Sequence, residues 1–176
     1  MDFYKLLMQE GKTIEKARHE HVFMQGETNE SLYLVQSGLL KAYYTSENGK
    51  ESVKSFLLPQ DLIGSLTSAY SEEGCSFSLI CLEASFLVEI PFSTLYDYGK
   101  KHHEVANKMI ELLLNLAMKK EKREFELLCL SAEERYCLLA ESSPELLEKV
   151  TQNDIARYLG VTPVALSRIK NRAYSR

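Results

Sequence analysis

The chain has 176 residues, of which 45% are hydrophobic and 26% charged, and its formal net charge at pH 7 is −4. This length and composition are typical of a globular protein with one large domain or two small ones. No apolar run is long enough to span a bilayer and no secretory signal pattern is present, so we expect a soluble, cytoplasmic protein without membrane contact.

Short strands separated by turn signals are predicted over residues 13–90. Asn48 and Gly49 are a strong signal for a hairpin turn, and Gly38 separates two further β-rich runs. The predicted strands are residues 31–36, 39–45, 52–58, 76–82 and 86–90. Many short strands at this spacing favour an antiparallel β-barrel or sandwich.

A long helix is predicted next, because residues 103–128 contain neither glycine nor proline. Its apolar residues are too numerous to cover a single surface. We expect one side to pack against the barrel and the other against a twin helix in a parallel homodimer; the alternative is an intramolecular core on both sides. The residues assigned to the dimer helix are Val105, Met109, Leu112 and Leu116, and Ile110, Leu113, Leu114 and Ala117 widen the apolar face.

The end of this helix carries a run of charges from Lys119 to Glu124, which is typical of a solvated face. Ser131 and Glu134 then form a capping box that opens another amphipathic helix, which Pro144 ends. We therefore predict three segments, namely the barrel in residues 1–99, the dimer helix and a hinge in residues 100–130, and a helical domain in residues 131–176.

The C-terminal residues predict two short helices joined by a tight glycine turn. Thr151 and Asp154 can cap the first helix, and Gly160 can adopt the left-handed conformation that ends it. Thr162 is a good N-cap for the second helix, where Pro163 suits the first position because its missing N–H would be unbonded anyway. The pattern is that of a helix-turn-helix, which places its second helix in the DNA major groove.

Charge supports this interpretation over a plain helical hairpin. Residues 151–176 carry a net charge of +4, from Arg157, Arg168, Lys170, Arg172 and Arg176 against Asp154, whereas residues 1–150 carry −8. Binding to phosphates needs a basic module of this kind, because much of the affinity comes from the release of counterions. We therefore expect double-stranded DNA as a partner.

A barrel, a long helix and a capped helix-turn-helix in this order resemble the family of the cyclic-AMP receptor protein and the fumarate-and-nitrate-reduction regulator (CRP/FNR). The motifs that carry the resemblance are residues 32–38, 59–64, 132–136 and 151–169. The resemblance implies an α+β fold in which a jelly-roll barrel, similar to cyclic-nucleotide-binding domains, acts as a sensor. It further implies a homodimeric bacterial transcription regulator whose barrel repositions the DNA-binding domains, with RNA polymerase as a further partner.

The effector pocket departs from the nucleotide-binding members of the family. Ser65 follows Gly64 where those members have a glutamate, and Cys75 stands at their arginine position, followed by Ser76 and Phe77. Glu72 and Glu73 nearby would repel a phosphate. A hydrogen bond to a charged group contributes about 1.5–3 kcal/mol, so the loss of two such groups should weaken binding by orders of magnitude. We expect a degenerate pocket that does not respond to cyclic AMP, and the effector is unknown.

Cofactor and metal signals are weak. The chain has no cysteine before Cys75 to hold an iron–sulfur cluster, and its four cysteines lack C-x-x-C spacing, so buried thiols are the simplest interpretation. Haem ligation by Cys75 is a remote alternative. His19 and His21 could share a strand face as in a metal-binding cupin barrel, but two solvent-facing histidines are the better interpretation. We expect neither a cofactor nor a metal.

The DNA-reading helix differs from that of the best-known members, which have arginine and glutamate where this chain has Pro163 and Val164. Arg168 is the first candidate for a base contact, since arginine pairs with guanine O6 and N7. Val164 could touch a thymine methyl, and Ser167 could bond several bases. Phosphates are the expected partners of Thr151, Gln152, Lys170 and Arg172, and Thr162 and Asn171 complete the predicted DNA-binding set.

Two hypotheses of different class follow. The first is a dimeric transcription regulator that binds an inverted-repeat site. The second is a cupin-like barrel that binds a small ligand or metal and carries a C-terminal helical hairpin for protein interaction. No nucleophile–base pair, P-loop or zinc spacing is present, so we do not expect an enzyme.

Overall fold

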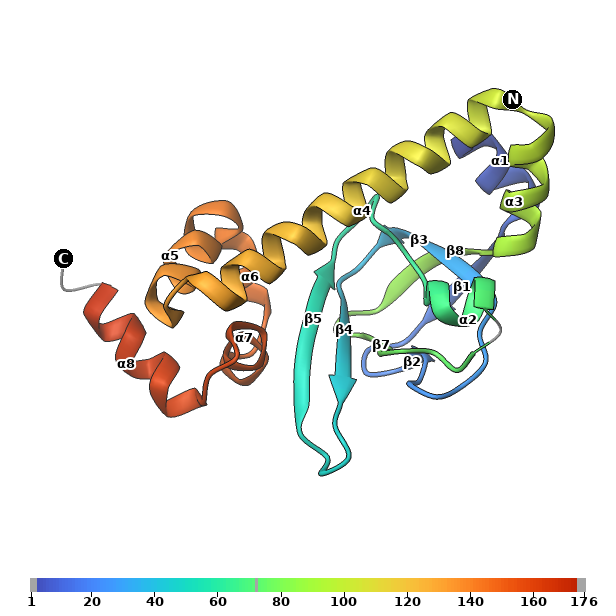
Figure 1. Cartoon of the computed structure of the whole chain (residues 1–176). Coiled ribbons are helices and arrows are strands. Elements are labelled where there is room, and N and C mark those ends of the chain that lie inside the picture. Colours follow the sequence, from blue (N-terminus) through green and yellow to red (C-terminus); the bar gives the residue numbers. More distant parts are fainter. Residues whose placement is uncertain (1–2, 72, 174–176) are drawn as a thin grey trace. The chain divides into compact units, whose positions relative to one another are not determined.

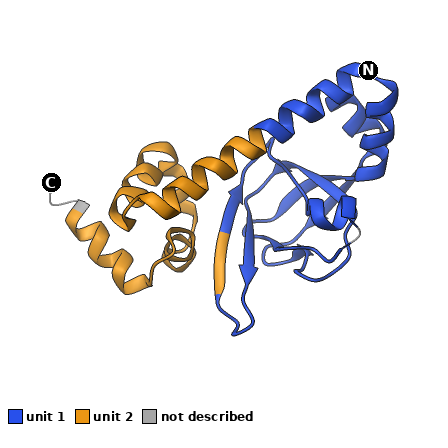
Figure 2. Cartoon of the chain, in the orientation of Figure 1, with its two compact units in different colours: residues 1–50, 54–114 blue, residues 51–53, 115–176 orange. Residues whose placement is uncertain are grey.

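The computed structural model describes residues 3–71 and 73–173, so the predictions that involve Glu72 and Arg176 lie outside the described residues. The chain divides into two compact units (Figures 1 and 2). The N-terminal unit holds residues 1–50 and 54–114, and the C-terminal unit holds residues 51–53 and 115–176. The predicted segment boundaries at residues 99 and 130 stay predictions.

The chain forms two four-stranded sheets, with strand orders β1-β8-β3-β6 and β2-β7-β4-β5, which lie in the N-terminal unit except for residues 51–53 at the start of β5. The strand pairs β1–β8, β2–β7, β3–β6, β3–β8 and β4–β7 are all antiparallel. The strands are β1 (Lys12–Lys16), β2 (His21–Phe23), β3 (Ser31–Ser37), β4 (Leu40–Thr45), β5 (Glu51–Leu57), β6 (Leu62–Ile63), β7 (Ser78–Cys81) and β8 (Ser85–Pro91). The predicted α+β fold with an antiparallel, jelly-roll-like barrel is confirmed.

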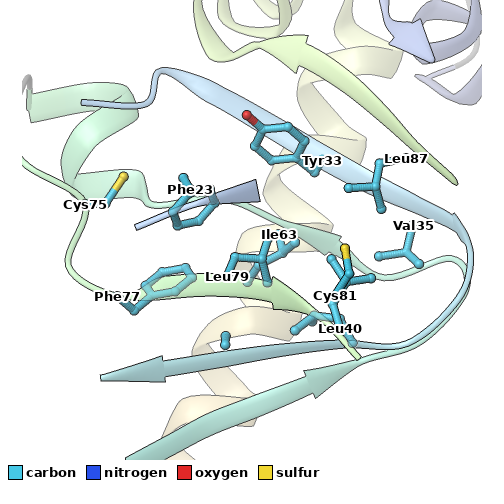
Figure 3. Close-up of a cluster of buried hydrophobic side chains, with 12 residues drawn as sticks. Phe23, Tyr33, Val35, Leu40, Ile63, Cys75, Phe77, Leu79, Cys81 and Leu87 are labelled. Carbon is cyan, nitrogen blue, oxygen red and sulfur yellow. The ribbon is translucent and has the colours of Figure 1, made fainter. Parts of the chain in front are cut away.

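The alternating direction of the side chains along β3 explains how this strand contributes to two hydrophobic clusters. Successive side chains of a strand point to opposite faces. Tyr33 and Val35 therefore join a cluster between the sheets, and Leu32 and Leu34 join a second cluster on the other face. Figure 3 shows the first cluster, which contains Phe23, Tyr33, Val35, Leu40, Ala42, Leu57, Ile63, Cys75, Phe77, Leu79, Cys81 and Leu87.

Helices cover the second cluster. These are α1 (Phe3–Glu10), α3 (Phe92–Lys101) and the first turns of α4 (His103–Cys129), while the short α2 (Leu66–Ser71) precedes β7. Their buried contributions are Phe3, Leu6, Leu7, Leu95 and Val105, which pack with Leu32, Leu34, Val88 and Ile90. The sheet β1-β8-β3-β6 is thus buried on both faces, which accounts for the unbroken run of buried residues 32–35 in β3.

The position of α4 corrects the prediction of which of its residues would contact a partner helix. Val105 is fully buried within the N-terminal unit, and Met109 and Leu112 pack against the same cluster. These three residues therefore face the chain's own core rather than a partner helix. Leu116, predicted with them, is half-buried, whereas Ile110, Leu113 and Leu114 are exposed. Periodicity identified two apolar sides of α4 but did not show which one the barrel covers.

The C-terminal unit continues from the second half of α4 into four further helices. They are α5 (Ala132–Ser142), α6 (Pro144–Lys149), α7 (Gln152–Leu159) and α8 (Pro163–Ala173). Their buried apolar residues are Tyr136, Leu139, Leu146, Val150, Ile155, Ala156, Leu159, Leu166 and Ile169. Among the described residues, no helix combines the length and the hydropathy that crossing a membrane requires.

Candidate nucleic-acid interface and effector pocket

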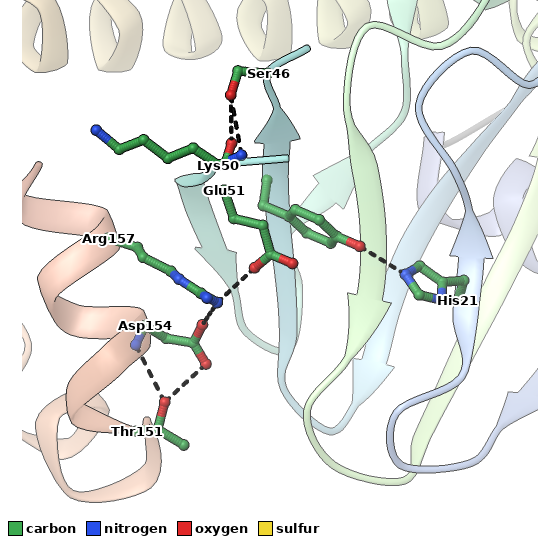
Figure 4. A network of polar contacts seen from close by, with 8 residues as sticks. His21, Ser46, Lys50, Glu51, Thr151, Asp154 and Arg157 are labelled. Atoms are coloured by element: carbon green, nitrogen blue, oxygen red, sulfur yellow. Dashed lines mark hydrogen bonds and ion pairs between the residues drawn. The ribbon is translucent and has the colours of Figure 1, made fainter. Parts of the chain in front are cut away.

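The start of α7 is fixed by a threonine cap (Figure 4). The Thr151 hydroxyl accepts a hydrogen bond from the Asp154 backbone N–H at 3.2 Å and donates to the Asp154 carboxylate at 3.0 Å. The carboxylate thus bonds the hydroxyl rather than completing a capping box with the Thr151 N–H, for which a glutamate is longer and better suited. Arg157 adds an ion pair to Asp154 at 3.7 Å.

The turn between α7 and α8 has the predicted geometry. Gly160 ends α7 in the left-handed region, with φ of 71° and ψ of 29°. The Ala156 carbonyl accepts from the Gly160 N–H and also from the Val161 N–H, the latter at 2.9 Å, which closes the turn at the helix end. Thr162 caps α8 by accepting from the Ala165 N–H at 3.2 Å, and α8 begins at Pro163. Both predicted helix starts and the glycine turn are confirmed.

Burial separates an inner and an outer side of α8. Leu166 and Ile169 are buried, as predicted, whereas Val164 keeps 64% of its surface exposed. The predicted base-contact residues Val164, Ser167 and Arg168 share this exposed side with Asn171 and Arg172. A basic helix that presents short and polar side chains along one face has the form that enters the major groove.

The residues predicted to bind phosphates lie at the start of α7 and the end of α8. Thr151 and Gln152 are exposed, and the Lys170 ammonium donates to the Gln152 side-chain oxygen at 3.0 Å. Arg172 forms an ion pair with Glu133 at 3.6 Å. The structure therefore brings Gln152 and Lys170 together from two helices, and contact of these side chains with phosphates stays a prediction.

Two arginines that the sequence did not single out contact the end of α7. Arg123, in the charge run predicted to be solvated, is only 19% exposed, and its guanidinium lies 3.9 Å from the centre of the Tyr158 ring. Arg135 donates to the Leu159 carbonyl at 2.9 Å. Burial raises the pKa of the Tyr158 phenol, although the adjacent Arg123 charge acts in the opposite direction. The amphipathic pattern of α4 could have identified Arg123 as an inward residue, but not its partner.

Gly64 and Ser65, at the degenerate effector pocket, are held by close packing. A Cβ atom at Gly64 would lie 2.4 Å from the Leu32 side chain and 2.8 Å from the Ser31 carbonyl oxygen, so the position requires glycine. Ser65 is fully buried, and its hydroxyl lies 2.9 Å from that of Thr67 and accepts from the Ser76 N–H at 3.2 Å. The serine thus stabilises the loop itself.

Cys75 and Phe77 belong to the core between the sheets rather than to an open pocket (Figure 3). Only 2% and 3% of their surfaces are exposed. The Phe77 ring meets Phe23 edge-on with 5.3 Å between ring centres, and the Lys54 ammonium lies 4.7 Å from the Phe77 ring centre. At the family's arginine position the chain therefore places a packed thiol that carries no positive charge.

The two histidines of the cupin-like hypothesis do not share a strand face. His19 lies in a turn before β2 with a positive φ of 67°, whereas His21 begins β2. The His21 Nε2 atom lies 2.9 Å from the Tyr43 hydroxyl, which Figure 4 shows as a dashed line. Within the described residues, no three histidine, cysteine, aspartate or glutamate side chains gather closely enough to hold a metal.

Comparison with known proteins agrees with this architecture. Residues 13–102 match the cyclic nucleotide-binding domain family. The anaerobic regulatory protein of Pasteurella multocida is 31% identical over 94% of this chain and 63% of its own length, and the fumarate and nitrate reduction regulatory protein of Escherichia coli K12 is 29% identical over 94% and 69%. The chain thus spans about two thirds of these relatives. FixK2 from Bradyrhizobium japonicum shares the fold with a TM-score of 0.80 at 20% identity, over 94% of this chain and 85% of FixK2.

Proposed function

Because the chain belongs to the CRP/FNR family of transcription regulators, we propose that it is a homodimer that binds an inverted-repeat DNA site without cyclic AMP. The observation that carries the proposal is the capped helix-turn-helix, in which α8 exposes Val164, Ser167 and Arg168 on one side. In such motifs the second helix enters the major groove and an exposed arginine can pair with guanine.

The dimer is proposed from the exposed side of α4. Apolar side chains recur there at helical spacing, with a charged interruption between Met118 and Phe125, so they form a stripe on the side of the helix opposite Val105 and Leu112. This exposed stripe consists of Ile110, Leu113, Leu114, Met118, Phe125 and Leu128, with exposed fractions between 50% and 76%. Contact with a twin helix would remove it from water. Two-fold symmetry would then place two half-sites about one helical turn, ~34 Å, apart.

Independence from cyclic AMP is proposed from the effector pocket. A cyclic nucleotide needs a cation for its phosphate and an acceptor for its ribose hydroxyl, and nucleotide-binding members supply an arginine and a glutamate. At these two positions the chain has the uncharged Cys75 and Ser65. Both residues are also buried in loop and core contacts. RNA polymerase is proposed as a further partner on family membership alone.

Selection of binding sites from a random duplex DNA pool tests the proposal. The purified protein, without added nucleotide, should enrich an inverted repeat. The Arg168→Ala variant at the same salt concentration should lose the base preference at one position of each half-site. Failure to enrich any sequence, with or without candidate effectors, would contradict DNA reading and favour a protein-interaction role for the C-terminal helices.

A further inference from the structure

The C-terminal end of α7 is held by side chains from two other helices. The last carbonyl groups of a helix have no partner within it and need donors from elsewhere. Arg123, from α4, donates to the Tyr158 carbonyl, and Arg135, from α5, donates to the Leu159 carbonyl at 2.9 Å. All of these residues belong to the C-terminal unit (Figure 2). Two consecutive carbonyls of α7 are thus tied to neighbouring helices.

Arg123 is restrained from more than one side. Its guanidinium lies 3.9 Å from the centre of the Tyr158 ring and 3.8 Å from the Glu126 carboxylate, while it also donates to the Tyr158 backbone. A planar guanidinium can stack and donate at once, which a lysine ammonium cannot do. The contact therefore fixes both the position and the orientation of Tyr158 relative to α4.

Arg135 joins the ends of two helices. Its Nη1 atom donates to the carbonyls of Leu130 and Glu126, the latter at 3.4 Å, and its Nη2 atom donates to Leu159. The first two carbonyls lie at the end of α4, and the third lies at the end of α7. Its Nε atom is buried without a hydrogen-bond partner in the described part of the chain. The Arg135 side chain thus forms hydrogen bonds with backbone carbonyls at the ends of both helices.

We infer that Arg123 and Arg135 are positioning residues that set the distance between the two DNA half-sites. They fasten the helix-turn-helix to the last turns of α4, which also carry Phe125 and Leu128 of the exposed stripe. In a dimer formed through that stripe, any rotation of α7 against α4 would move the two α8 helices relative to each other. The inference rests on the proposed function, because it requires a dimer that binds DNA.

DNA offers a sharp test of this geometry. One additional base pair between half-sites moves the second half-site by ~3.4 Å and rotates it by about 34°, since a helical turn contains about 10.5 base pairs. If the helix-turn-helix is held rigidly against α4, the dimer should bind the altered spacing weakly. If that connection is loosened, the dimer should bind both spacings with similar affinity. The measurement is the ratio of affinities for the selected site and for sites with one base pair added or removed, at constant salt.

The variants are chosen to separate position from charge. Arg123→Met removes the stacked guanidinium, and Lys122→Met removes the same charge from a neighbouring side chain that is 72% exposed. We expect the wild type and Lys122→Met to prefer the selected spacing by about tenfold or more, the size of one base mismatch, and Arg123→Met to discriminate by less than about threefold. Tyr158→Leu should behave like Arg123→Met, and Tyr158→Phe, which keeps the ring and the carbonyl, like the wild type.

The possible outcomes are distinct. Arg123→Met and Tyr158→Leu proteins that still discriminate tenfold would overturn the inference, and so would a Lys122→Met protein that loses discrimination. Hydrogen exchange supplies a readout without DNA, in which Arg123→Met should lower the protection of α7 amides but not of the amides in the middle of α4. A wild type that binds no DNA would refute the proposed function, and unchanged α7 protection in Arg123→Met would separately refute the rigid connection.

Discussion

Glycine is required at two turns of the barrel for different reasons. Gly38 and Gly49 both have a positive φ, of 100° and 78°. A Cβ atom at Gly49 would meet nothing within 4 Å, whereas one at Gly38 would lie 2.7 Å from the Ser85 Cβ and 2.9 Å from the Ala84 carbonyl oxygen. At Gly49 only the backbone conformation excludes other residues, and at Gly38 the lack of space does so too.

We therefore predict that alanine at the two positions lowers the free energy of unfolding by unequal amounts. Gly49→Ala should lower the free energy of unfolding by about 1–2 kcal/mol, the cost of a left-handed conformation for a residue with a Cβ atom. Gly38→Ala should cost clearly more, because backbone and buried side chain must also move. Urea denaturation of both variants measures the difference, and equal losses would show that the space around Gly38 is not limiting.

On α8, which we propose as the DNA-reading helix, neighbouring cations should have different effects. Arg168 is the proposed base contact, and Lys170, bonded to Gln152, is a proposed phosphate contact. Arg168→Ala should cost about 1–3 kcal/mol of binding and relax specificity at one base pair. Lys170→Ala should weaken binding to all sequences alike and reduce the slope of log affinity against log salt by about one. Salt titrations on the selected and a scrambled site measure both effects, and exchanged behaviour would reverse the two assignments.

At the scale of the element, α4 carries two apolar sides with different tasks. Leu112 packs against the buried cluster of the N-terminal unit, whereas Leu114 is 59% exposed. Leu114→Glu should therefore leave the fold intact and yield monomers that bind DNA weakly. Leu112→Glu should instead destabilise the N-terminal unit, because it introduces a charge into an apolar core. Light scattering after size-exclusion chromatography, together with thermal denaturation, distinguishes these results, and a Leu114→Glu dimer would contradict the proposed interface.

The helices show which features the sequence could predict and which it could not. Helix starts depend on local contacts, so Ser131, Thr151 and Thr162 could be recognised as caps from their immediate neighbours. The role of Val105 depends on where distant residues such as Leu6 lie, so periodicity alone could not show that its side of α4 packs against the chain's own core. Arg123 likewise looked solvated within its charge run, because Tyr158 is far away in the chain.

In the whole molecule, the distribution of charge and the chemistry of the effector pocket both agree with the proposed regulator that does not respond to cyclic AMP. The basic residues 151–176 and the acidic remainder were evident from sequence alone. The departures at Ser65 and Cys75 were also evident, but only the structure showed these side chains buried in loop and core contacts. In physical terms, the sequence identifies which charges are missing, whereas the three-dimensional packing determines which side chains take up the space.

The proposed function requires DNA binding that does not depend on cyclic AMP. The most direct measurement is the affinity of the purified protein for its selected inverted repeat at one salt concentration, without nucleotide and with cyclic AMP at millimolar concentration. We predict equal affinities, because the uncharged Ser65 and Cys75 give cyclic AMP no charged partner through which to favour one state of the protein. Specific binding that appears only with cyclic AMP, or tightens tenfold with it, would contradict the proposal.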